Sequence, residues 1–405
     1  MHILLIHQAF AALNEAGGTR HHELARALVE RGHQVTVIAS PVSYLTGISQ
    51  AAPRWLERES GGPGITLLRV YTYPALHRGF FHRLAGFFSF MVSSFLAGLG
   101  VRNVDLVWGT SPPIFQAATA WALARLKRVP FLLEIRDLWP AFAIAMGVLR
   151  QPVLIHASLW LESFLYRHAD RLVINSPGFQ QHVLSRGARQ VELVPNGADP
   201  AMFDPQASGA GFRASHGLDG LFIALYAGAH GPSNDLDVVL EAAQLSLPFT
   251  PIRFVLLGDG KEKPRLVAKA RQMGLNNVIF IPPVPKNEMD EALAAANCCI
   301  AILKPIELYK TTYPNKVFDY MAAGRPVVLA IDGVIREVVE SAGAGIPVPP
   351  GDPQALATAI QALSSDPERC QRLGLAGRQA IEQHFSRSEL ATRMALVMEG
   401  MKEAA

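Results

Sequence analysis

The chain has 405 residues, of which half are hydrophobic and 18% are charged. This composition excludes a disordered chain, and the length exceeds what one hydrophobic core usually supports, so we expect two domains. Three cysteines, two of them adjacent, lack the spacing of a disulfide framework or a zinc site. They indicate a reducing, cytoplasmic environment.

Charge is unevenly distributed along the chain. Residues 1–199 contain 18 Lys and Arg against 12 Asp and Glu, whereas residues 200–405 contain 19 against 22. Ten of the 13 histidines also lie in the first half. An anionic partner such as a lipid surface or a diphosphate would therefore favour the first half, whereas the lack of basic runs with interleaved aromatic residues argues against nucleic acid.

Short apolar runs alternate with segments of helical period, which predicts βαβ units and parallel sheets. The chain opens with MHILLIHQAF, which has no basic region or cleavage site, so we expect a first strand here and no secretion signal. The strand pattern restarts near residue 220. In the first half we expect strands at 3–6, 34–39, 66–71, 106–108, 131–135, 171–175 and 191–194, and in the second half at 222–226, 253–257, 278–280, 299–303 and 326–330.

The restart predicts an α/β fold of two doubly wound, Rossmann-like parallel-sheet domains, with ligands in an interdomain cleft at the carboxyl ends of the strands. We expect an N-terminal domain at 1–199 and a linker at 200–218, a stretch rich in Pro, Gly, Asp and Ser. A second domain would follow at 219–385. A C-terminal helix at 386–405 would pack back on the first domain.

The first strand is followed by Gly17-Gly18-Thr19 and then by a segment of helical period. Two glycines at a strand-to-helix turn allow backbone N–H groups to approach a phosphate at the helix N-terminus. A tight turn needs glycine for steric reasons alone, so the motif has a purely structural interpretation as well. We take Gly17 and Gly18 as candidate donor-binding residues.

One segment departs from the alternation. Residues 84–101, LAGFFSFMVSSFLAGLGV, contain no charge and approach the length of a bilayer-spanning helix. Two interpretations stay open, a buried core helix and a helix in the membrane interface. A membrane span is the least favoured, because strands of one sheet are expected on both sides of it. The large apolar residues at helical spacing are Phe80, Leu84, Phe87, Phe88, Met91, Phe95 and Leu99, opposite Ser89 and Ser93.

Two expected strands of the second half also end in glycine turns. Gly228-Ala229-His230-Gly231 follows one, and Gly258-Asp259-Gly260 follows the next. With Gly17 and Gly18 they place glycine at three corresponding strand ends, which favours a phosphate-binding cleft. The dinucleotide fingerprint GxGxxG with a downstream acidic residue is absent.

The strongest cluster of polar residues lies within residues 304–326. Lys310, Thr311 and a further lysine, Lys316, flank the start of a helix predicted near Asn315. Free N–H groups and the positive end of the helix dipole add to the lysine charges, so this is a candidate diphosphate site. Asp319 comes about one turn later, where a carboxylate could accept hydrogen bonds from the two hydroxyls of a ribose. A solvated basic loop is the structural alternative.

Six motifs follow one another along nearly the whole chain. They are GGTRHHELARALVERGHQVTVIA, EIRDLWP, LVPNGAD, LYAGAHG, VLLGDG and YPNKVFDYMAAGRPVV. Taken together, they resemble the retaining glycosyltransferases of family 4, which have the GT-B fold. The most specific of them, PNKVFDYMAAGRPVV, is similar to that of bacterial transferases for O-antigen and related surface polysaccharides. The resemblance implies that the second domain binds a nucleoside-diphosphate sugar and the first domain the acceptor.

The sequence departs from the family at the donor site. The E-x7-E motif of the family falls on Thr311 and Asp319, so both glutamates are replaced. The resemblance implies that Asp319 holds the ribose and that Thr311 contacts the donor sugar only weakly. The usual Arg and Lys after the first strand of the second domain are missing, and only His230 is available there. Neutralisation of the diphosphate then moves to Lys316, assisted by Lys310 or Lys304.

In the first domain, the motif EIRDLWP matches a family motif in which an aspartate faces the donor sugar. Asp137 would hydrogen-bond a sugar or acceptor hydroxyl, and capping of the next turn is its structural alternative. Asp235-Leu236-Asp237 has the form of a DxD metal motif but stands at a predicted helix start, where capping explains it better. We therefore expect no metal and no cofactor, the nucleotide sugar being a substrate.

The expected reaction is transfer of an N-acetylated hexose or deoxyhexose from a UDP-linked donor to a polyprenyl-diphosphate-linked glycan or another membrane acceptor. The protein would then be cytoplasmic and peripherally bound to the inner face of the cytoplasmic membrane. Three alternatives stay open. They are a UDP-sugar 2-epimerase of similar fold, a non-catalytic nucleotide-sugar-binding partner in a polysaccharide assembly complex, and an NAD-dependent oxidoreductase, which the missing fingerprint disfavours.

Overall fold

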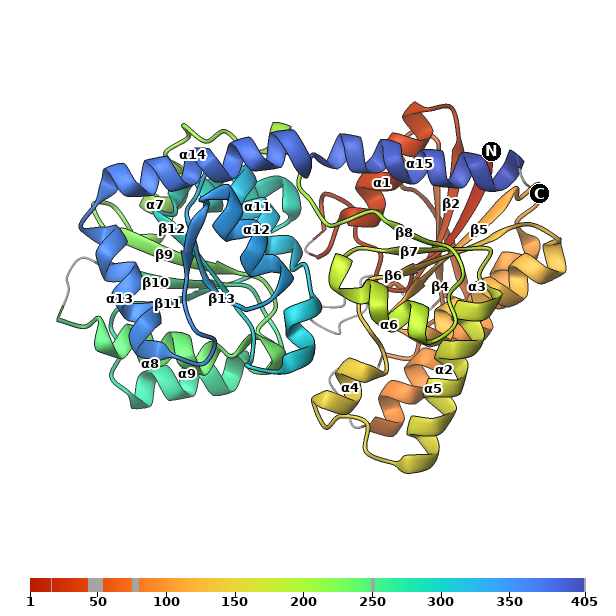
Figure 1. The fold of residues 1–405 in the computed structure, drawn as a ribbon, viewed down its shortest axis with the longest axis horizontal. Coiled ribbons are helices and arrows are strands. Elements are labelled where there is room, and N and C mark those ends of the chain that lie inside the picture. The colour runs from red at the N-terminus through yellow and green to blue at the C-terminus, as the bar shows by residue number, and fades with distance from the viewer. Residues whose placement is uncertain (16, 43–53, 75–79, 249–251, 404–405) are drawn as a thin grey trace. The chain divides into compact units, whose positions relative to one another are not determined.

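The computed structural model describes residues 1–15, 17–42, 54–74, 80–248 and 252–403. The chain divides into two compact units. Unit 1 comprises residues 1–12, 17–195 and 388–405, and unit 2 comprises residues 13–16 and 196–387. Each unit is an α/β domain built around one predominantly parallel sheet (Figure 1).

Unit 1 contains an eight-stranded sheet in the order β3-β4-β2-β1-β5-β6-β7-β8, parallel except for β3. Helices cover both of its faces, with α1 and α15 on one and α2, α3 and α5 on the other (Figure 1). The strands are β1 (His2–Ile6), β2 (Gln34–Ala39), β3 (Leu56–Ser60), β4 (Ile65–Val70), β5 (Leu106–Ser111), β6 (Phe131–Ile135), β7 (Arg171–Ile174) and β8 (Val191–Leu193). The helices are α1 (Arg20–Glu30), α2 (Phe80–Gly100), α3 (Ile114–Lys127), α4 (Ala141–Ala145), α5 (Pro152–His168), α6 (Gln180–Ser185) and α15 (Arg387–Glu403).

Unit 2 contains a six-stranded parallel sheet in the order β11-β10-β9-β12-β13-β14. This is the strand order of a dinucleotide-binding doubly wound domain, and its topological switch point lies between β9 and β12. The strands are β9 (Phe222–Ala227), β10 (Ile252–Leu257), β11 (Val278–Ile281), β12 (Cys298–Ile302), β13 (Val327–Ala330) and β14 (Gly345–Pro347). The helices are α7 (Ala210–His216), α8 (Leu236–Leu245), α9 (Lys263–Gln272), α10 (Met289–Ala295), α11 (Asn315–Ala322), α12 (Val334–Ala342), α13 (Pro353–Ser364) and α14 (Pro367–His384).

Every strand expected from the sequence overlaps a strand of the structure, and the α/β prediction is confirmed. Two strands were not anticipated. The antiparallel edge strand β3 has the sequence LERES and is exposed at alternate positions, so it has no apolar run. The short strand β14, GIP, consists of residues that are normally signals for turns.

The segment 200–218, which we expected to be a linker, belongs to unit 2. Phe203, Phe212 and Leu218 are buried in the hydrophobic core of that unit. The glycines that gave the segment its linker-like composition flank α7, where Gly209 and Gly217 have φ angles of 59° and 63°. Their left-handed conformation begins and ends a helix, so the composition reflects helix boundaries.

The C-terminal helix α15 lies against the α1 side of unit 1 (Figure 1). Its apolar face, including Met394 and Met398, joins the cluster formed by α1 and the central strands. On its polar face Glu399 pairs with Arg31 at 3.0 Å and with His33 at 2.9 Å. The last segment of the chain thus completes the core of the first unit.

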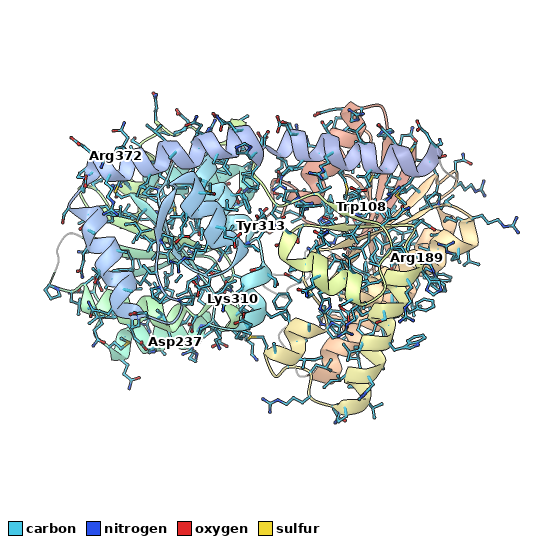
Figure 2. All side chains as sticks on the ribbon, in the orientation of Figure 1. Trp108, Arg189, Asp237, Lys310, Tyr313 and Arg372 are labelled. Carbon is cyan, nitrogen blue, oxygen red and sulfur yellow. The ribbon has the colours of Figure 1, made fainter. Side chains whose placement is uncertain are left out.

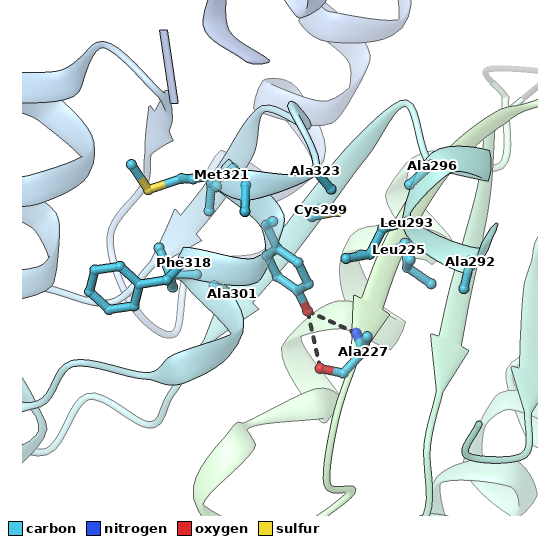
Figure 3. Close-up of a cluster of buried hydrophobic side chains, with 14 of the residues drawn as sticks. Leu225, Ala227, Ala292, Leu293, Ala296, Cys299, Ala301, Phe318, Met321 and Ala323 are labelled. Atoms are coloured by element: carbon cyan, nitrogen blue, oxygen red, sulfur yellow. Dashed lines mark hydrogen bonds between the residues drawn. The ribbon is translucent and has the colours of Figure 1, made fainter. Parts of the chain in front are cut away.

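In unit 2 a buried tyrosine attaches α11 to the end of β9. The hydroxyl of Tyr320 accepts a hydrogen bond from the backbone N–H of Ala227 at 2.9 Å and donates to its carbonyl oxygen at 3.1 Å (Figure 3). Phe318, Met321 and Ala323 pack into the same apolar cluster. As predicted, α11 begins at Asn315, and it stops before Gly324, which has a φ of 66°. The helix that carries Lys316 is therefore fixed relative to the strand ends.

In unit 1 a buried carboxylate fixes the start of α1. Glu134 of β6 accepts hydrogen bonds from Arg20 Nε at 2.9 Å, His21 Nε2 at 2.8 Å and Trp108 Nε1 at 3.2 Å. Arg20 also donates to the carbonyl oxygens of Val194 and Pro195, both at 2.8 Å. The turn formed by Gly17 and Gly18 is thereby held at the carboxyl edge of the sheet.

The ionisation of this cluster follows from burial and pairing. Burial opposes ionisation of Glu134. His21 and Arg20 outweigh this effect through their positive charge and their hydrogen bonds, and they hold the pKa of Glu134 well below that of an ordinary glutamate. Burial, opposed by Glu134, lowers the pKa of His21 to about 4. At neutral pH His21 is therefore neutral, and Glu134 and Arg20 form the ion pair.

We predict that Glu134→Ala destabilises unit 1 by about 3–5 kcal/mol, because Arg20 would be left buried without its carboxylate. All five tryptophans lie in unit 1, so tryptophan fluorescence during urea unfolding measures the stability of this unit. Glu192→Ala is the control, since Glu192 on β8 is partly exposed and lies 3.5 Å from Arg171. Its loss should cost less than about 1 kcal/mol, and equal effects of the two substitutions would contradict the prediction.

Candidate functional site

The carboxyl ends of β9 and β10 approach each other through glycines. Gly228 and Gly258 have φ angles of 145° and 146°. A Cβ atom on Gly258 would lie 1.9 Å from the carbonyl oxygen of Gly228, and one on Gly260 would lie 2.6 Å from that of His230. No side chain fits between these loops, so the structure places both predicted glycine turns together, beside the switch point of the sheet.

Lys316 on α11 reaches over the same turn. Its ammonium group donates to the hydroxyl of Tyr226 at 2.8 Å and to Asn234 Oδ1 at 3.4 Å, and it lies 4.0 Å from the centre of the Tyr226 ring. It is 3.1 Å from the point that a Cβ of Gly228 would occupy. The Tyr226 hydroxyl in turn donates to the carbonyl oxygen of Ala229 at 2.7 Å.

No carboxylate in the described ranges forms an ion pair with Lys316. Burial lowers the pKa of Lys316 to about 7, because the cation loses water and its neighbours Tyr226 and Asn234 are neutral. An anion bound at the glycine turn would favour the protonated, charged form of Lys316. The arrangement therefore gives a cation that is positioned but not neutralised.

His230 lies beneath this turn and not at its surface. Its ring is fully buried, and neither ring nitrogen has a hydrogen-bond partner among the described residues. Tyr226 and Phe280 flank the ring, with centroid distances of 6.0 and 6.2 Å. Burial and the charge of Lys263 lower the pKa of His230 to about 4. A neutral, enclosed imidazole supports the loop but adds no positive charge to the site.

Asp319, the expected ribose ligand, is held by a residue that the sequence analysis missed. Lys286 Nζ lies 2.6 Å from Asp319 Oδ2, and both side chains are largely buried. The ammonium group of Lys286 also lies 5.3 Å from the centre of the Phe203 ring. Lys316 and Asp319 are three residues apart on α11 and so share a helix face. A cation and a fixed carboxylate are thus presented side by side.

The other candidates in this region have different surroundings. Asn315 Oδ1 accepts a hydrogen bond from Arg387 at 3.1 Å, and Thr311 Oγ1 donates to the carbonyl oxygen of Leu308 at 2.7 Å. Lys310 is exposed and lies 2.7 Å from Glu307, so its charge is compensated at the surface. The backbone N–H of Lys304 donates to Ser233 at 3.0 Å, which joins the loops that follow β12 and β9.

In unit 1 the glycine turn and Asp137 lie at the carboxyl edge of the sheet. Gly17 packs closely, since a Cβ there would be 3.0 Å from Ala11 Cβ, whereas Gly18 faces open space. Asp137 follows β6 with an exposed side chain that forms no capping hydrogen bond in the described structure, so the capping alternative finds no support. Desolvation, opposed by Arg136, raises the pKa of Asp137 to about 6, although contact with solvent limits this effect.

In the DxD-like sequence, Asp235 stands at the start of α8 and Asp237 lies in the first turn of this helix. Asp237, labelled in Figure 2, pairs with Arg265 at 2.6 Å and with Lys269 at 2.8 Å. Asp235 stands at the helix start with a φ of 46° but makes no capping hydrogen bond with its side chain, so the expected capping role was wrong. Across the described residues, no group of three or more His, Cys, Asp or Glu side chains could hold a metal ion.

The apolar helix α2 buries Phe90 and exposes a stripe of other large side chains. Gly86, Ser93, Ser94 and Gly98 are on its buried side, and a Cβ on Gly98 would lie 2.4 Å from Leu123 Cδ1 of α3. The small residues thus allow close packing on α3. Among the helices the structure describes, none is long and apolar enough to cross a bilayer. The exposed residues are Phe88, Val92, Leu96 and Leu99, each at least 43% exposed; the side chain of Phe80 lies outside the described residues.

The geometry of unit 2 fits a phosphorylated ligand. A glycine turn that admits close approach, a positioned cation and the start of α11 meet beside the switch point, which is where α/β sheets bind phosphates. The carboxylate of Asp319 on the same helix face can accept hydrogen bonds from a diol such as a ribose. The site offers anion and hydroxyl binding.

The sequence matches two family models in succession. Residues 16–197 match the model described as glycosyl transferase 4-like domain, and residues 222–366 match glycosyl transferases group 1. The colanic acid biosynthesis glycosyl transferase WcaI of Escherichia coli K12 is 27% identical over 356 residues, which are 84% of this chain and 86% of WcaI. A D-inositol 3-phosphate glycosyltransferase of Nocardia farcinica is 26% identical over 386 residues, 89% of this chain and 80% of that protein.

Solved structures share the fold at low sequence identity. Sucrose-phosphate synthase of Thermosynechococcus elongatus has a TM-score of 0.80 at 19% identity, over 100% of both chains. HepE of Anabaena, solved with UDP and glucose, has a TM-score of 0.74 at 17% identity, over 99% of this chain and 100% of HepE. With the family models, which together cover most of the chain, these likenesses lead to one conclusion: the chain belongs to the family 4 type of glycosyltransferases and has the GT-B fold.

Proposed function

We propose that the protein transfers a sugar, with retention, from a UDP-linked donor to a lipid-linked acceptor at the cytoplasmic membrane, in surface polysaccharide synthesis. Binding of the donor is supported above all by the ammonium group of Lys316, which lies over the Gly228 turn without a carboxylate partner. HepE, of the same fold, was solved with UDP-glucose as well as UDP, which supports a UDP-linked donor here. We propose an N-acetylated hexose or deoxyhexose as the sugar.

The polysaccharide assignment draws on the relatives. WcaI is named for colanic acid biosynthesis, and WaaG, which has a TM-score of 0.67 at 16% identity over 98% of this chain and 99% of WaaG, is described as involved in lipopolysaccharide biosynthesis. The outward apolar stripe of α2 supports a membrane acceptor such as a polyprenyl-diphosphate-linked glycan. A sugar epimerase acts on a soluble substrate and would have no use for this stripe.

In the proposed mechanism, unit 2 stabilises the leaving group. As the bond to the sugar breaks, negative charge grows on the departing diphosphate, and Lys316 is placed to receive it together with backbone N–H groups at the start of α11. Asp319, oriented by Lys286, would accept hydrogen bonds from the ribose. These contacts hold the nucleotide while the sugar is transferred.

Retention would follow from attack on the face that the diphosphate leaves. The leaving phosphate itself would accept the proton of the acceptor hydroxyl, so no residue of the chain need act as a nucleophile. Asp137, exposed at the strand end of unit 1, would hydrogen-bond a hydroxyl of the acceptor or sugar. Gly17 and Gly18 would allow the substrate to approach the backbone.

We predict that Lys316→Ala lowers kcat by about 10²–10³-fold, which is the usual effect of removing one preorganised group that stabilises charge in the transition state. Turnover would be measured with UDP-sugars and lipid-linked acceptors extracted from bacterial membranes. Lys269→Ala is the control, because Lys269 pairs with Asp237 on the surface of unit 2. Near-normal turnover in Lys316→Ala would remove this residue from the mechanism.

The affinity for UDP should depend on pH through Lys316. Because its pKa in the free protein is about 7, raising the pH from 6.5 to 9 removes the charge that attracts the diphosphate, so UDP should bind more weakly. Lys316→Arg keeps its charge over this range and should flatten the dependence. The affinity for UDP is measured by calorimetric titration of the wild type and of Lys316→Arg at several pH values. Parallel pH profiles for the two proteins would contradict the prediction.

The apolar stripe of α2 should contribute to membrane binding. Val92→Asn with Leu96→Asn should weaken co-sedimentation with phospholipid vesicles about tenfold, because two apolar side chains would no longer enter the interface. The matched control, Leu245→Asn with Leu375→Asn, removes two exposed apolar side chains from unit 2. If both double variants bind vesicles like the wild type, α2 is not a membrane contact.

A further inference from the structure

Unit 1 has a pocket at the amino-terminal edge of its sheet, opposite to the edge where Asp137 lies. It has a volume of about 430 Å³ and lies where β7 and β8 begin and α5 ends. Because these are the amino ends of the strands, the pocket is separate from the glycine turn and from the acceptor side proposed above. Its lining includes Trp121, Arg125, Arg167, His168, Asp170 and Arg189, of which Arg189 is labelled in Figure 2.

The pocket has an excess of positive charge. Arg125 donates to Asp170 at 2.9 Å and to the carbonyl oxygen of His168 at 3.2 Å. Arg167 and Arg189 are exposed and make no ion pair or hydrogen bond within the part of the chain that the structure describes. Three guanidinium groups therefore face one carboxylate. Two arginines remain available for an anion.

Trp121 adds an unsatisfied donor to the lining. Its Nε1 is buried and has no acceptor among the described residues. Its ring packs edge-on against Phe164, with a centroid distance of 4.8 Å. A buried N–H group without a partner is unfavourable, and guanidinium groups bind oxygen anions bidentately. An oxygen-rich anion such as a phosphate group in the pocket would accept hydrogen bonds from the two available arginines, whereas the Nε1 of Trp121 is buried and closed to it.

An aromatic series leads from the pocket to an exposed apolar surface. On α5 the ring of His168 stacks on Phe164 at 4.2 Å, and Phe164 stacks on Trp160 at 5.4 Å. Trp160 is 66% exposed, and Val153, two helical turns earlier on the same face, is 76% exposed. A binding site for free phosphate has no need of these side chains, whereas tryptophan beside basic residues is typical of the membrane interface.

We propose that this pocket binds the phosphate of an anionic phospholipid headgroup, while Trp160 and Val153 enter the adjoining lipid. The helix α3 contacts both α5 and α2, so the pocket and the stripe of α2 belong to one layer of helices on the same side of the sheet (Figure 1). The inference deepens the membrane association proposed above. It does not rest on the transferase activity.

The test uses the full-length protein and two matched double variants. Arg167→Gln with Arg189→Gln removes the unpaired arginines, and Arg26→Gln with Arg58→Gln removes two charges from α1 and β3 of the same unit. Binding is measured by co-sedimentation with phosphatidylcholine vesicles, with and without phosphatidylglycerol. Trp121→Phe, which keeps an aromatic ring but lacks the N–H group, is measured in the same way. Inorganic phosphate is titrated by calorimetry in parallel.

We expect the pocket variant to bind phosphatidylglycerol vesicles at least about tenfold more weakly than the wild type, with unchanged binding to neutral vesicles. The control should stay within about twofold, and Trp121→Phe should bind like the wild type, because the buried Nε1 does not reach a ligand in the pocket. Equal losses in both double variants would indicate diffuse electrostatic attraction and overturn the proposal. Tight binding of inorganic phosphate with no preference for phosphatidylglycerol would also overturn the proposal. The same holds if an RNA oligonucleotide, titrated in place of vesicles, binds the protein and requires these arginines.

The two membrane contacts can fail separately. Loss of vesicle binding in the α2 variant, but not in the pocket variant, would support the proposed association through α2 and overturn the headgroup site. Loss in the pocket variant alone would do the reverse. Thermal unfolding of each variant, followed by tryptophan fluorescence, shows whether unit 1 remains folded.

Discussion

The ammonium group of Lys316 is held by a phenol, an amide and an aromatic face, and by no carboxylate. The proposed donor site depends on this arrangement, because a cation without a counter-ion in a partly buried position favours an incoming anion. The surrounding structure keeps it there. Tyr320 ties α11 to the end of β9, and Gly228 leaves the space that the lysine side chain occupies.

At the corresponding strand ends of unit 1, the buried charge is paired. Glu134, a buried carboxylate at these strand ends, is paired with Arg20 and hydrogen-bonded to His21 and Trp108, so the cluster orders the start of α1 and carries little net charge. A satisfied buried pair gives rigidity, whereas an unpaired cation gives affinity for a ligand. Two sheets of similar topology thus use buried charge for different purposes.

The chain departs from its family at residues of the second domain. The basic residues that usually follow the first strand of the second domain are absent, and the structure offers Lys316 of α11 in their place. Asp319 stands where the family motif has its second glutamate, and its carboxylate forms an ion pair with Lys286.

The sequence by itself determined the parallel strands of both sheets except β14, and the bounds of α11, because buried parallel strands are apolar runs and helix ends carry local signals. It also located the glycine turns and Lys316. Only the tertiary structure decided that Glu134 is a paired core residue, that Lys286 contacts Asp319, and that Gly98 of α2 packs on Leu123 of α3. These features depend on residues far apart in the chain, and neither periodicity nor spacing records which distant side chain completes a pair or covers a helix face.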